Sequence, residues 1–443
     1  MNALVVSLLV VICIILTIIL TTKVKLHAFI ALFIVSLLLA FSTLPASTII
    51  KTIKDGFGGT MGSIGFLIIL GAIIGITLDK TGGTLSIANY ILSKTGEKKS
   101  AAALGITGFI TGLPIFCDSG FIILSGLAKS FSIKSGIAMP FMATVLATSL
   151  YSVHCLIPPH PGALAAAGIL NTNIGYLILL GIVFAVPGAL AAYFWGKWIT
   201  GRKGNRHSSF SGTIENSPPE NLPPVFLSFL PITIPLLLIT LKSLTTLIDK
   251  SGVGVLSKVL YFPGEPVIAL AIGVFFALLL IKKKSVGEMN SVFSEAIVKA
   301  GPILIITAAG GMFGMVIKST GVGETVGEIL KAAGIGLIVP FLIAIIMKTA
   351  QGSSTVAIIT TASFVAPMMP VLGLQTEWGK LLTMLAMGSG SMIASHANDS
   401  YFWVVTNFSE IRVEDTFGIY TTATVIMGLT VFACVWIFSL FVL

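Results

Sequence analysis

Charged side chains are scarce in this sequence. Asp, Glu, Lys and Arg make up only 10% of its 443 residues, whereas soluble domains carry about 25%. Apolar residues account for 55% of the chain and form runs that approach or exceed the roughly 20 residues of a membrane-spanning helix. The runs are continuously apolar and not alternating, so we expect helices and not barrel strands. The sequence therefore predicts an all-α polytopic membrane protein surrounded by lipid.

Cysteine is scarce as well, and its spacing fits neither a metal site nor a disulfide framework. The four cysteines lie within or beside apolar runs, as small apolar side chains: Cys13, Cys117, Cys155 and Cys434. The sequence also lacks the HExxH, GxSxG and Walker motifs of common enzymes. We therefore expect no enzyme activity, no bound metal and no cofactor.

Basic residues outnumber acidic ones, 26 to 17, but they form no patch suited to nucleic acid. They gather between apolar runs at 23–25, 197–206 and 282–284, a pattern typical of cytoplasmic loops. Residues 2–22 lack the basic start and the cleavage site of a signal peptide. We interpret them as a first spanning helix with its N-terminus outside.

The apolar runs predict about ten spanning helices and two interrupted segments. The predicted crossings are residues 2–22, 26–44, 61–79, 136–168, 174–196, 225–241, 263–281, 301–318, 379–408 and 416–442. Residues 100–130 and 335–370 are too long for one helix and have small and polar residues at their centres. We interpret both as re-entrant hairpins, which are tolerated where the turn is buried or lines a wet cavity. Two ordinary short helices in each segment are the alternative.

Internal similarity divides the chain into halves at 1–200 and 225–443, joined by a hydrophilic cytoplasmic linker at 201–224. One common offset superimposes Gly71 on Gly310 and also Thr144 on Thr383. If the basic clusters are cytoplasmic, both chain ends lie outside and corresponding helices of the two halves run in opposite directions. Such an inverted-topology repeat is typical of secondary transporters.

Polar residues mark the centres of both interrupted segments. The first turns at "FCDSGF" and the second at "AQGSSTVAIITT". A Ser, Thr or Gly at a helix start caps or exposes free N–H groups, and the positive end of the helix dipole attracts anions. Serines that only cap a buried turn are the alternative. The candidate substrate-binding residues of the two turns are Asp118, Ser119, Gly120, Gly352, Ser353, Ser354 and Thr355.

Two of the predicted crossings contain further polar residues. In 136–168, "HCLIPPHPG" has adjacent prolines that break a helix, which places His160 on unwound backbone facing a cavity. His154, just upstream, is expected to point elsewhere. In 379–408, "GSGSMIASHANDSYFW" packs several polar side chains into an apolar crossing, where they usually mark a substrate or ion path. An interfacial loop is the alternative reading of this second stretch.

The chain resembles the gluconate permease (GntP) family of bacterial carboxylate transporters, within the ion-transporter superfamily. The matching blocks, spread over about residues 55–425, are "GLPIFCDSGF", "HCLIPPHPG", "ITAAGGMFGMVIKSTGVG", "GSSTVAIITTA" and "GSGSMIASHANDSYFW". The resemblance implies proton-coupled uptake of a sugar acid or similar small hydroxy acid, or of D-serine as in some members. It also implies a scaffold and a transport domain, a homodimer and an elevator-like motion in the bacterial inner membrane.

Three positions depart from the family pattern. Cys117 stands where a bulkier apolar residue is expected, and Lys348 and Gln351 stand where the family has Arg and Thr. Lysine is a point charge and lacks the bidentate fork with which arginine recognises a carboxylate.

These features predict a symporter that carries a small hydroxy-carboxylate such as gluconate inward with protons. The residues at the two turns would bind it together with His160, His396 and Asn398. Asp118, Asp399 or His396 would carry the proton, because burial disfavours a charged carboxylate. Sodium-coupled transport of a carboxylate or of D-serine is the alternative. A channel is disfavoured, because broken inverted repeats are typical of alternating access.

Overall fold

The computed structural model describes residues 3–95, 100–203, 222–248, 254–282, 285–320, 336–370, 372–397 and 399–443. All regular structure in these ranges is helical, which confirms the all-helical part of the predicted fold class. Six of the described helical segments are long and apolar enough to cross a membrane, and shorter apolar helices accompany them. The chain is thus an all-helical, multi-pass membrane protein.

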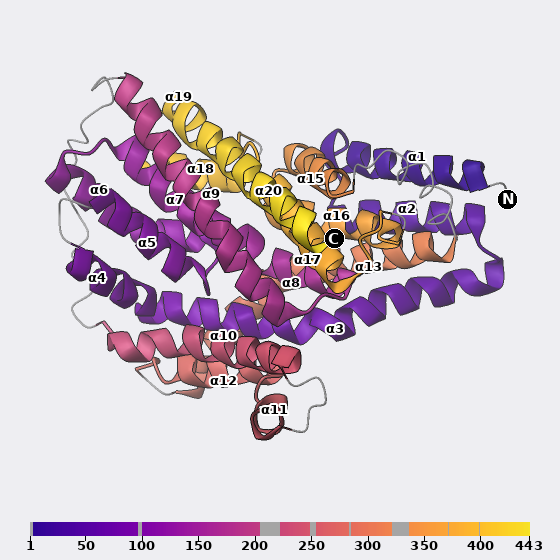
Figure 1. The fold of residues 1–443 in the computed structure, drawn as a ribbon, viewed down its shortest axis with the longest axis horizontal. Coiled ribbons are helices and arrows are strands. Elements are labelled where there is room, and N and C mark those ends of the chain that lie inside the picture. Colours follow the sequence, from indigo (N-terminus) through magenta and orange to yellow (C-terminus); the bar gives the residue numbers. More distant parts are fainter. Residues whose placement is uncertain are drawn as a thin grey trace.

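Two long helices, α3 (Ala46–Thr81) and α13 (Val286–Ser319), pack against each other near the N-terminal helices (Figure 1). The sequence predicts crossings only at 61–79 and 301–318, so both helices begin well before the predicted positions. At 1.5 Å per residue α3 is about 54 Å long, which exceeds the roughly 30 Å of membrane hydrocarbon. The additional turns are less apolar than a crossing, and packing against the partner helix stabilises them.

Glycine allows this close packing of α3 against α13. A Cβ atom on Gly56 would lie 2.8 Å from the Met312 Cα atom and 2.8 Å from the Met315 Cβ atom. Distances this short do not occur between real carbon atoms, so any side chain at this position forces the two helices apart. The remaining N-terminal helices are α1 (Ala3–Thr22) and α2 (Ala28–Thr43).

The segment predicted as the first hairpin forms two helices joined by a turn. They are α5 (Ser100–Gly112) and α6 (Cys117–Ser135), which pack on each other and follow α4 (Gly83–Thr95). The turn at 113–116 contains Pro114, which cannot supply the backbone N–H that a continuous helix needs.

The next predicted crossing is broken where its prolines lie. Helix α7 (Met139–Leu156) ends just before Pro158, and α8 (Pro161–Leu170) begins after His160. Helix α9 (Ile174–Lys203) then runs back along α7. The break follows from sequence, because two adjacent prolines remove two N–H donors and clash with the preceding turn.

A helix–turn–helix and a broken helix also occur in the described chain after residue 336. Gly352 ends one helix in the left-handed conformation, with φ of 74°, and Ser353 begins the next. The predicted crossing 379–408 is likewise two helices and not one. The elements are α10 (Val225–Ile248), α11 (Val255–Tyr261), α12 (Pro266–Leu278), α15 (Ile338–Gln351), α16 (Ser354–Val365), η3 (Ala366–Met368), α17 (Glu377–Ser391), α18 (Ser400–Ser409), α19 (Val413–Asp415), η4 (Thr416–Thr421) and α20 (Thr422–Val442).

Among the residues that the structure describes, buried apolar side chains form three clusters. The first surrounds α7, whose residues are all buried, and joins α5–α9 to α15–α20. The second packs α3, α4, α10, α12 and α13 together, and the third packs α1 and α2 against α13. Helices α9 and α20 expose large apolar side chains such as Phe194 and Phe441 on their outer faces, as lipid contact requires.

Gly56→Ala is expected to destabilise the protein by about 1–3 kcal/mol, because the new methyl group overpacks the α3–α13 contact. Gly58→Ala on the same helix is the matched control, since nothing lies within 4 Å of its added Cβ atom. Thermal unfolding of both variants in detergent measures the difference. Equal melting temperatures for the two variants would contradict the role of Gly56.

Candidate functional site

A cavity of about 240 Å³, here called the central cavity, lies between α6, α7, α13, α16 and α18. Three of these helices begin at its wall, which contains Asp118, Ser354 and Ser400 from their first turns. Helix N-termini present free N–H groups and partial positive charge. Tyr151 and His154 of α7 add polar groups. The arrangement suits a small anion that also carries hydroxyl groups.

Asp118 lies in the first turn of α6, where a carboxylate interacts favourably with the helix dipole. Its Oδ1 atom is buried and has no hydrogen-bond partner among the residues that the structure describes. Buried polar atoms are rarely left unpaired in folded proteins. This oxygen is therefore available to a ligand or to a proton.

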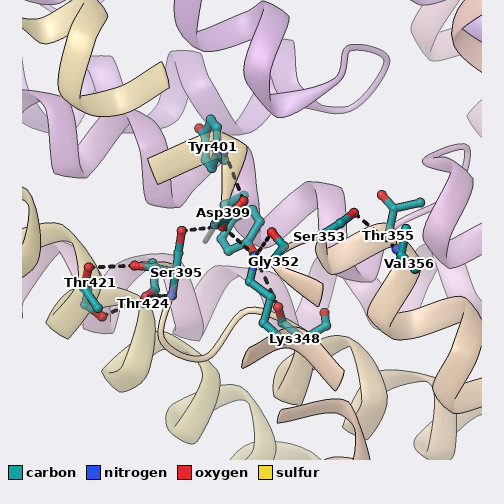
Figure 2. Close-up of polar contacts among 12 residues, drawn as sticks. Lys348, Gly352, Ser353, Thr355, Val356, Ser395, Asp399, Tyr401, Thr421 and Thr424 are labelled. Carbon is teal, nitrogen blue, oxygen red and sulfur yellow. Dashed lines mark hydrogen bonds and ion pairs between the residues drawn. The ribbon is translucent and has the colours of Figure 1, made fainter. Parts of the chain in front are cut away.

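The start of α16 is capped without any acid. Ser353 Oγ accepts a hydrogen bond from the Val356 N–H at 3.3 Å, and the first turn of the helix contains no carboxylate (Figure 2). Ser353, Ser354 and Thr355 all line the central cavity. The positive end of this helix is thus left for a ligand to neutralise.

The start of α18 is held by a buried ion pair. Asp399 Oδ1 accepts from the Tyr401 N–H at 3.1 Å, and its Oδ2 atom lies 2.5 Å from Lys348 Nζ (Figure 2). The exposed fractions of the Lys348 and Asp399 side chains are only 1% and 4%. Lys348 also donates to the Gly352 carbonyl at 3.1 Å, at the C-terminal end of α15. One cation therefore joins the end of α15 to the start of α18.

Further hydrogen bonds fix this ion pair in position. Ser395 Oγ donates to Asp399 Oδ2 at 2.5 Å, and the Tyr420 hydroxyl lies 3.1 Å from Ser395 Oγ. Thr421 and Thr424 hold the Ser395 backbone, through its carbonyl at 2.6 Å and its N–H at 3.2 Å (Figure 2). Ser395 and Asp399, which lie between α17 and α18, are thus held by hydrogen bonds to each other and to neighbouring elements.

Two histidines link the C-terminal end of α5 to α16. His160 Nε2 lies 2.6 Å from the Gly112 carbonyl, and the Nδ1 atoms of His160 and His154 are 3.2 Å apart. His154 Nε2 lies 3.2 Å from Thr355 Oγ1. The chain turns back after α7, and this turn brings residue 160 beside residue 154. His154, which the sequence suggested would point elsewhere, is the one that lines the cavity.

When both imidazoles are neutral, the acceptor at one end of this series of hydrogen bonds decides which atom donates in each bond. The Gly112 carbonyl can only accept, so His160 Nε2 donates to it and His160 Nδ1 accepts. His154 Nδ1 must then donate, which leaves its Nε2 atom to accept from the Thr355 hydroxyl. Thr355 Oγ1 therefore faces the cavity as a hydrogen-bond acceptor.

The other predicted site residues lie outside the cavity wall. Ser119 is absent from the lining of the central cavity, and a Cβ atom on Gly120 would lie 2.9 Å from Leu150 Cδ2, so Gly120 provides helix packing. His396 and Gly352 flank the ion pair without lining the cavity. Asn398 falls outside the residues that the structure describes.

Sequence reasoning missed the role of Lys348, which it noted only as a departure from a family pattern. The signal was present, because Lys348 lies in an apolar helix and a buried lysine requires an acidic partner. Asp79 was also passed over, although it too is an acid in an apolar run.

An all-helical polytopic protein with a polar cavity between broken helices has the architecture of a membrane transporter. The profile described as GntP family permease matches residues 5–441 of the chain. The chain belongs to the GntP permease family, which confirms the resemblance drawn from its motifs. It is a transporter and not an enzyme.

Relatives match over nearly the whole length. The inner membrane permease YgbN of Escherichia coli strain K12 is 33% identical over 430 residues, 94% of each chain. The gluconate permease of Pseudomonas aeruginosa is 29% identical over 421 residues, 92% of this chain and 91% of the relative. The solved structure of Neisseria gonorrhoeae MtrF has a TM-score of 0.64 at 15% identity, with 89% of this chain and 86% of that chain covered. This last likeness shows the shared fold.

Lys348→Met is expected to cost about 3–5 kcal/mol of stability, because it leaves Asp399 as a buried, unpaired charge. Lys348→Met combined with Asp399→Asn should recover much of the loss, since no unpaired charge remains. Denaturant or thermal unfolding in detergent measures both.

The matched control is Lys80→Met, which breaks the half-exposed Lys80–Glu295 pair at 2.8 Å. Exposed pairs contribute about 0–1 kcal/mol, so this variant should melt near the parent temperature. A single Lys348 variant as stable as the control would contradict the structural role of the buried pair.

Proposed function

We propose that this permease takes up a small hydroxy-carboxylate, such as gluconate or a related sugar acid, together with protons. The observation that carries the proposal is the start of α16. Of the three helix starts at the central cavity, those of α6 and α18 already carry Asp118 and Asp399, whereas α16 carries no acid. A substrate carboxylate would bind at the N–H groups of α16, beside Ser354 and Thr355.

The hydroxyl groups of the substrate have a matching partner. Thr355 donates its own proton to His154, so its oxygen accepts from a ligand hydroxyl. The cavity of about 240 Å³ lies just below the usual 300–1,000 Å³ of ligand pockets, which favours a small acid. The name of the Pseudomonas aeruginosa relative, gluconate permease, agrees with this substrate class.

The balance of charges at the central cavity explains why substrate uptake would be coupled to protons. Lys348 and Asp399 cancel each other, so Asp118 is the carboxylate at the cavity without a described cationic partner in contact. Two like charges about 4 Å apart repel by about 4 kcal/mol at an effective dielectric constant of 20. An anionic substrate and an ionised Asp118 therefore disfavour each other, and protonation of Asp118 removes the repulsion. Proton and substrate then promote each other's binding, as symport requires.

We further propose the transport architecture predicted from sequence. The helix pairs α5–α6 and α15–α16 act as opposed re-entrant hairpins of an inverted repeat, within halves 1–200 and 225–443 joined at 201–224. The cavity lies where the first apolar cluster meets α13, which suits a transport domain sliding against a scaffold. The protein would be a homodimer in the bacterial inner membrane with both termini outside, and its transported partners are the acid and the proton.

D-serine is the second candidate, and Asp118 is the reason. An ionised Asp118 would bind the ammonium group of an amino acid whose carboxylate occupies the start of α16. The two candidates differ in pH dependence. Hydroxy acids would bind best with Asp118 protonated, at lower pH, and D-serine with Asp118 ionised, at higher pH. Sodium coupling is the remaining alternative, and uptake in sodium-free buffer under a proton gradient tests it.

Asp118→Asn is expected to retain gluconate binding and counterflow but to lose accumulation driven by a pH gradient, because asparagine stays neutral at every pH. Purified protein in liposomes is assayed with labelled gluconate, D-glycerate and D-serine. Asp55→Asn, an exposed acid on α3, is the control and should behave like the parent. Parental accumulation by the Asp118 variant would contradict proton coupling through this residue.

Thr355→Val is expected to weaken binding of the hydroxy acid by about 1 kcal/mol, or roughly fivefold, because one hydrogen bond is lost. Thr355→Ser keeps the hydroxyl and should bind like the parent. Titration calorimetry with gluconate measures both. Equal affinities for the Val and Ser variants would contradict the hydroxyl contact.

A further inference from the structure

A polar cavity of about 430 Å³, here called the outer cavity, lies at the C-terminal ends of α8 and α13. Its wall includes Thr60 and Ser63 of α3, Lys318 of α13 and Lys380 of α17. Residues of the turn after α16, between 366 and 370, also line it. The outer cavity is larger than the central cavity of about 240 Å³, so it has room for the same small acid.

The outer cavity and the central cavity lie along the same two helices. On α13, Ile303 and Ile306 line the central cavity and Gly311 lines the outer cavity. On α16, Ile359 lines the central cavity, and Ala366, just after the helix, lines the outer cavity. At 1.5 Å per residue, the two cavities are about 7 to 11 Å apart along either helix. At most two helical turns therefore separate them.

Close packing of α13 on α16 fills this stretch. A Cβ atom on Gly310 would lie 2.2 Å from Ser363 Oγ, and one on Gly314 would lie 3.3 Å from the Ser363 carbonyl oxygen. The Ser363 side chain is fully buried. Next to it, the rings of Phe313 and Phe364 pack edge to face with their centroids 5.4 Å apart. The contact of Gly310 with Ser363 thus closes the central cavity off from the outer cavity.

This contact between α13 and α16 contains no polar interaction. Ser363 Oγ donates to the Ile359 carbonyl of its own helix at 2.8 Å, and no hydrogen bond or ion pair joins the described residues of α13 to those of α16. In contrast, α13 is attached to α3 by an ion pair of 2.8 Å between Lys80 and Glu295. Helices α13 and α16 can therefore separate without breaking a polar bond, while α13 stays on α3.

The charges of the outer cavity suit an anion. Asp55 and Lys318 are exposed to solvent, and their opposite charges offset each other. Lys380 is half-buried and donates to the Asn171 carbonyl at 3.3 Å, which offsets the negative C-terminal end of α8. An ammonium group has three N–H donors, so two N–H groups of Lys380 remain for a ligand.

We propose that the outer cavity is the entry site for the anionic substrate, and that the contact of Gly310 with Ser363 is the gate between this site and the central cavity. The inference rests on the proposed function. In the proposed topology the basic 282–284 cluster before α13 is cytoplasmic, so the C-terminal end of α13 and the outer cavity face the outside. A carboxylate would bind first beside Lys380, and it would reach the start of α16 when α13 and α16 separate.

Gly310→Cys combined with Ser363→Cys tests the gate. The two Cβ atoms would lie 3.4 Å apart, close to the roughly 3.5–4.5 Å of disulfides. Oxidation of this double variant in intact cells should abolish uptake of labelled gluconate, D-glycerate and D-serine, and a reducing agent should restore it. Each single variant cannot form the disulfide and should be insensitive to the oxidant. Equal uptake by the cross-linked and the reduced double variant overturns the gate.

Ser63→Cys tests the entry route, and it also decides if the double variant does not fold. Ser63 is exposed and lines the outer cavity, so a bulky, membrane-impermeant thiol reagent attached there should block uptake. Excess gluconate should slow the labelling. Lys54→Cys is exposed on the same helix outside the cavity wall, and both this variant and the parent should keep uptake after treatment. Unimpaired uptake by fully labelled Ser63→Cys overturns the entry site.

Lys380→Gln tests the charge of the entry site. The KM for gluconate should rise about fivefold, the effect of one unit charge near a ligand in water, with the maximal rate near that of the parent. Lys380→Arg should keep the parental KM, as should Lys54→Gln. An unchanged KM in Lys380→Gln, or a fall in the maximal rate alone, overturns the entry site. Absence of uptake of all three compounds by the parent protein instead overturns the proposed function.

Discussion

The buried pair of Lys348 and Asp399 is the interaction on which the site depends. It joins the C-terminal end of α15 to the N-terminal end of α18, through contacts of 2.5 Å to the carboxylate and 3.1 Å to the Gly352 carbonyl. Both helix ends are interrupted backbone inside an apolar protein, and each would be costly without a charged partner. The pair also cancels its own charge. In the proposed function, Asp118 is thereby left as the acid that takes up the proton when the anionic substrate binds.

The central cavity forms where several helices are interrupted. Pro158 and Pro159 end α7, Pro114 helps separate α5 from α6, and Gly352 separates α15 from α16. Each interruption creates a helix end with free backbone groups, and the fold brings three helix starts to one wall. Dipoles that are modest in water act strongly in a dry interior, so fixed backbone groups can select an anion without many charged side chains.

Local signals in the sequence were read correctly where their cause is local. The prolines predicted the break before α8, and Ser353 caps α16 as its position suggested. The extra length of α3 was missed, because its polar N-terminal turns are stabilised by packing against α13 and not by their own composition. His154 was misjudged for a related reason, since its neighbour in space, Thr355, lies in the other half of the chain.

The sequence by itself determined the class of protein, because apolar runs without charge have no stable place outside a membrane. It also determined where helices break and which family the chain belongs to, since both depend on short stretches of residues. Only the tertiary structure decided which acid meets a base and which stays unpaired. Lys348 neutralises Asp399 across the fold, while Asp118 Oδ1 and Asp79 Oδ1 stay without a hydrogen-bond partner in the described part of the chain. These pairings join residues far apart in the chain, and burial energies that decide them exist only once the helices have packed.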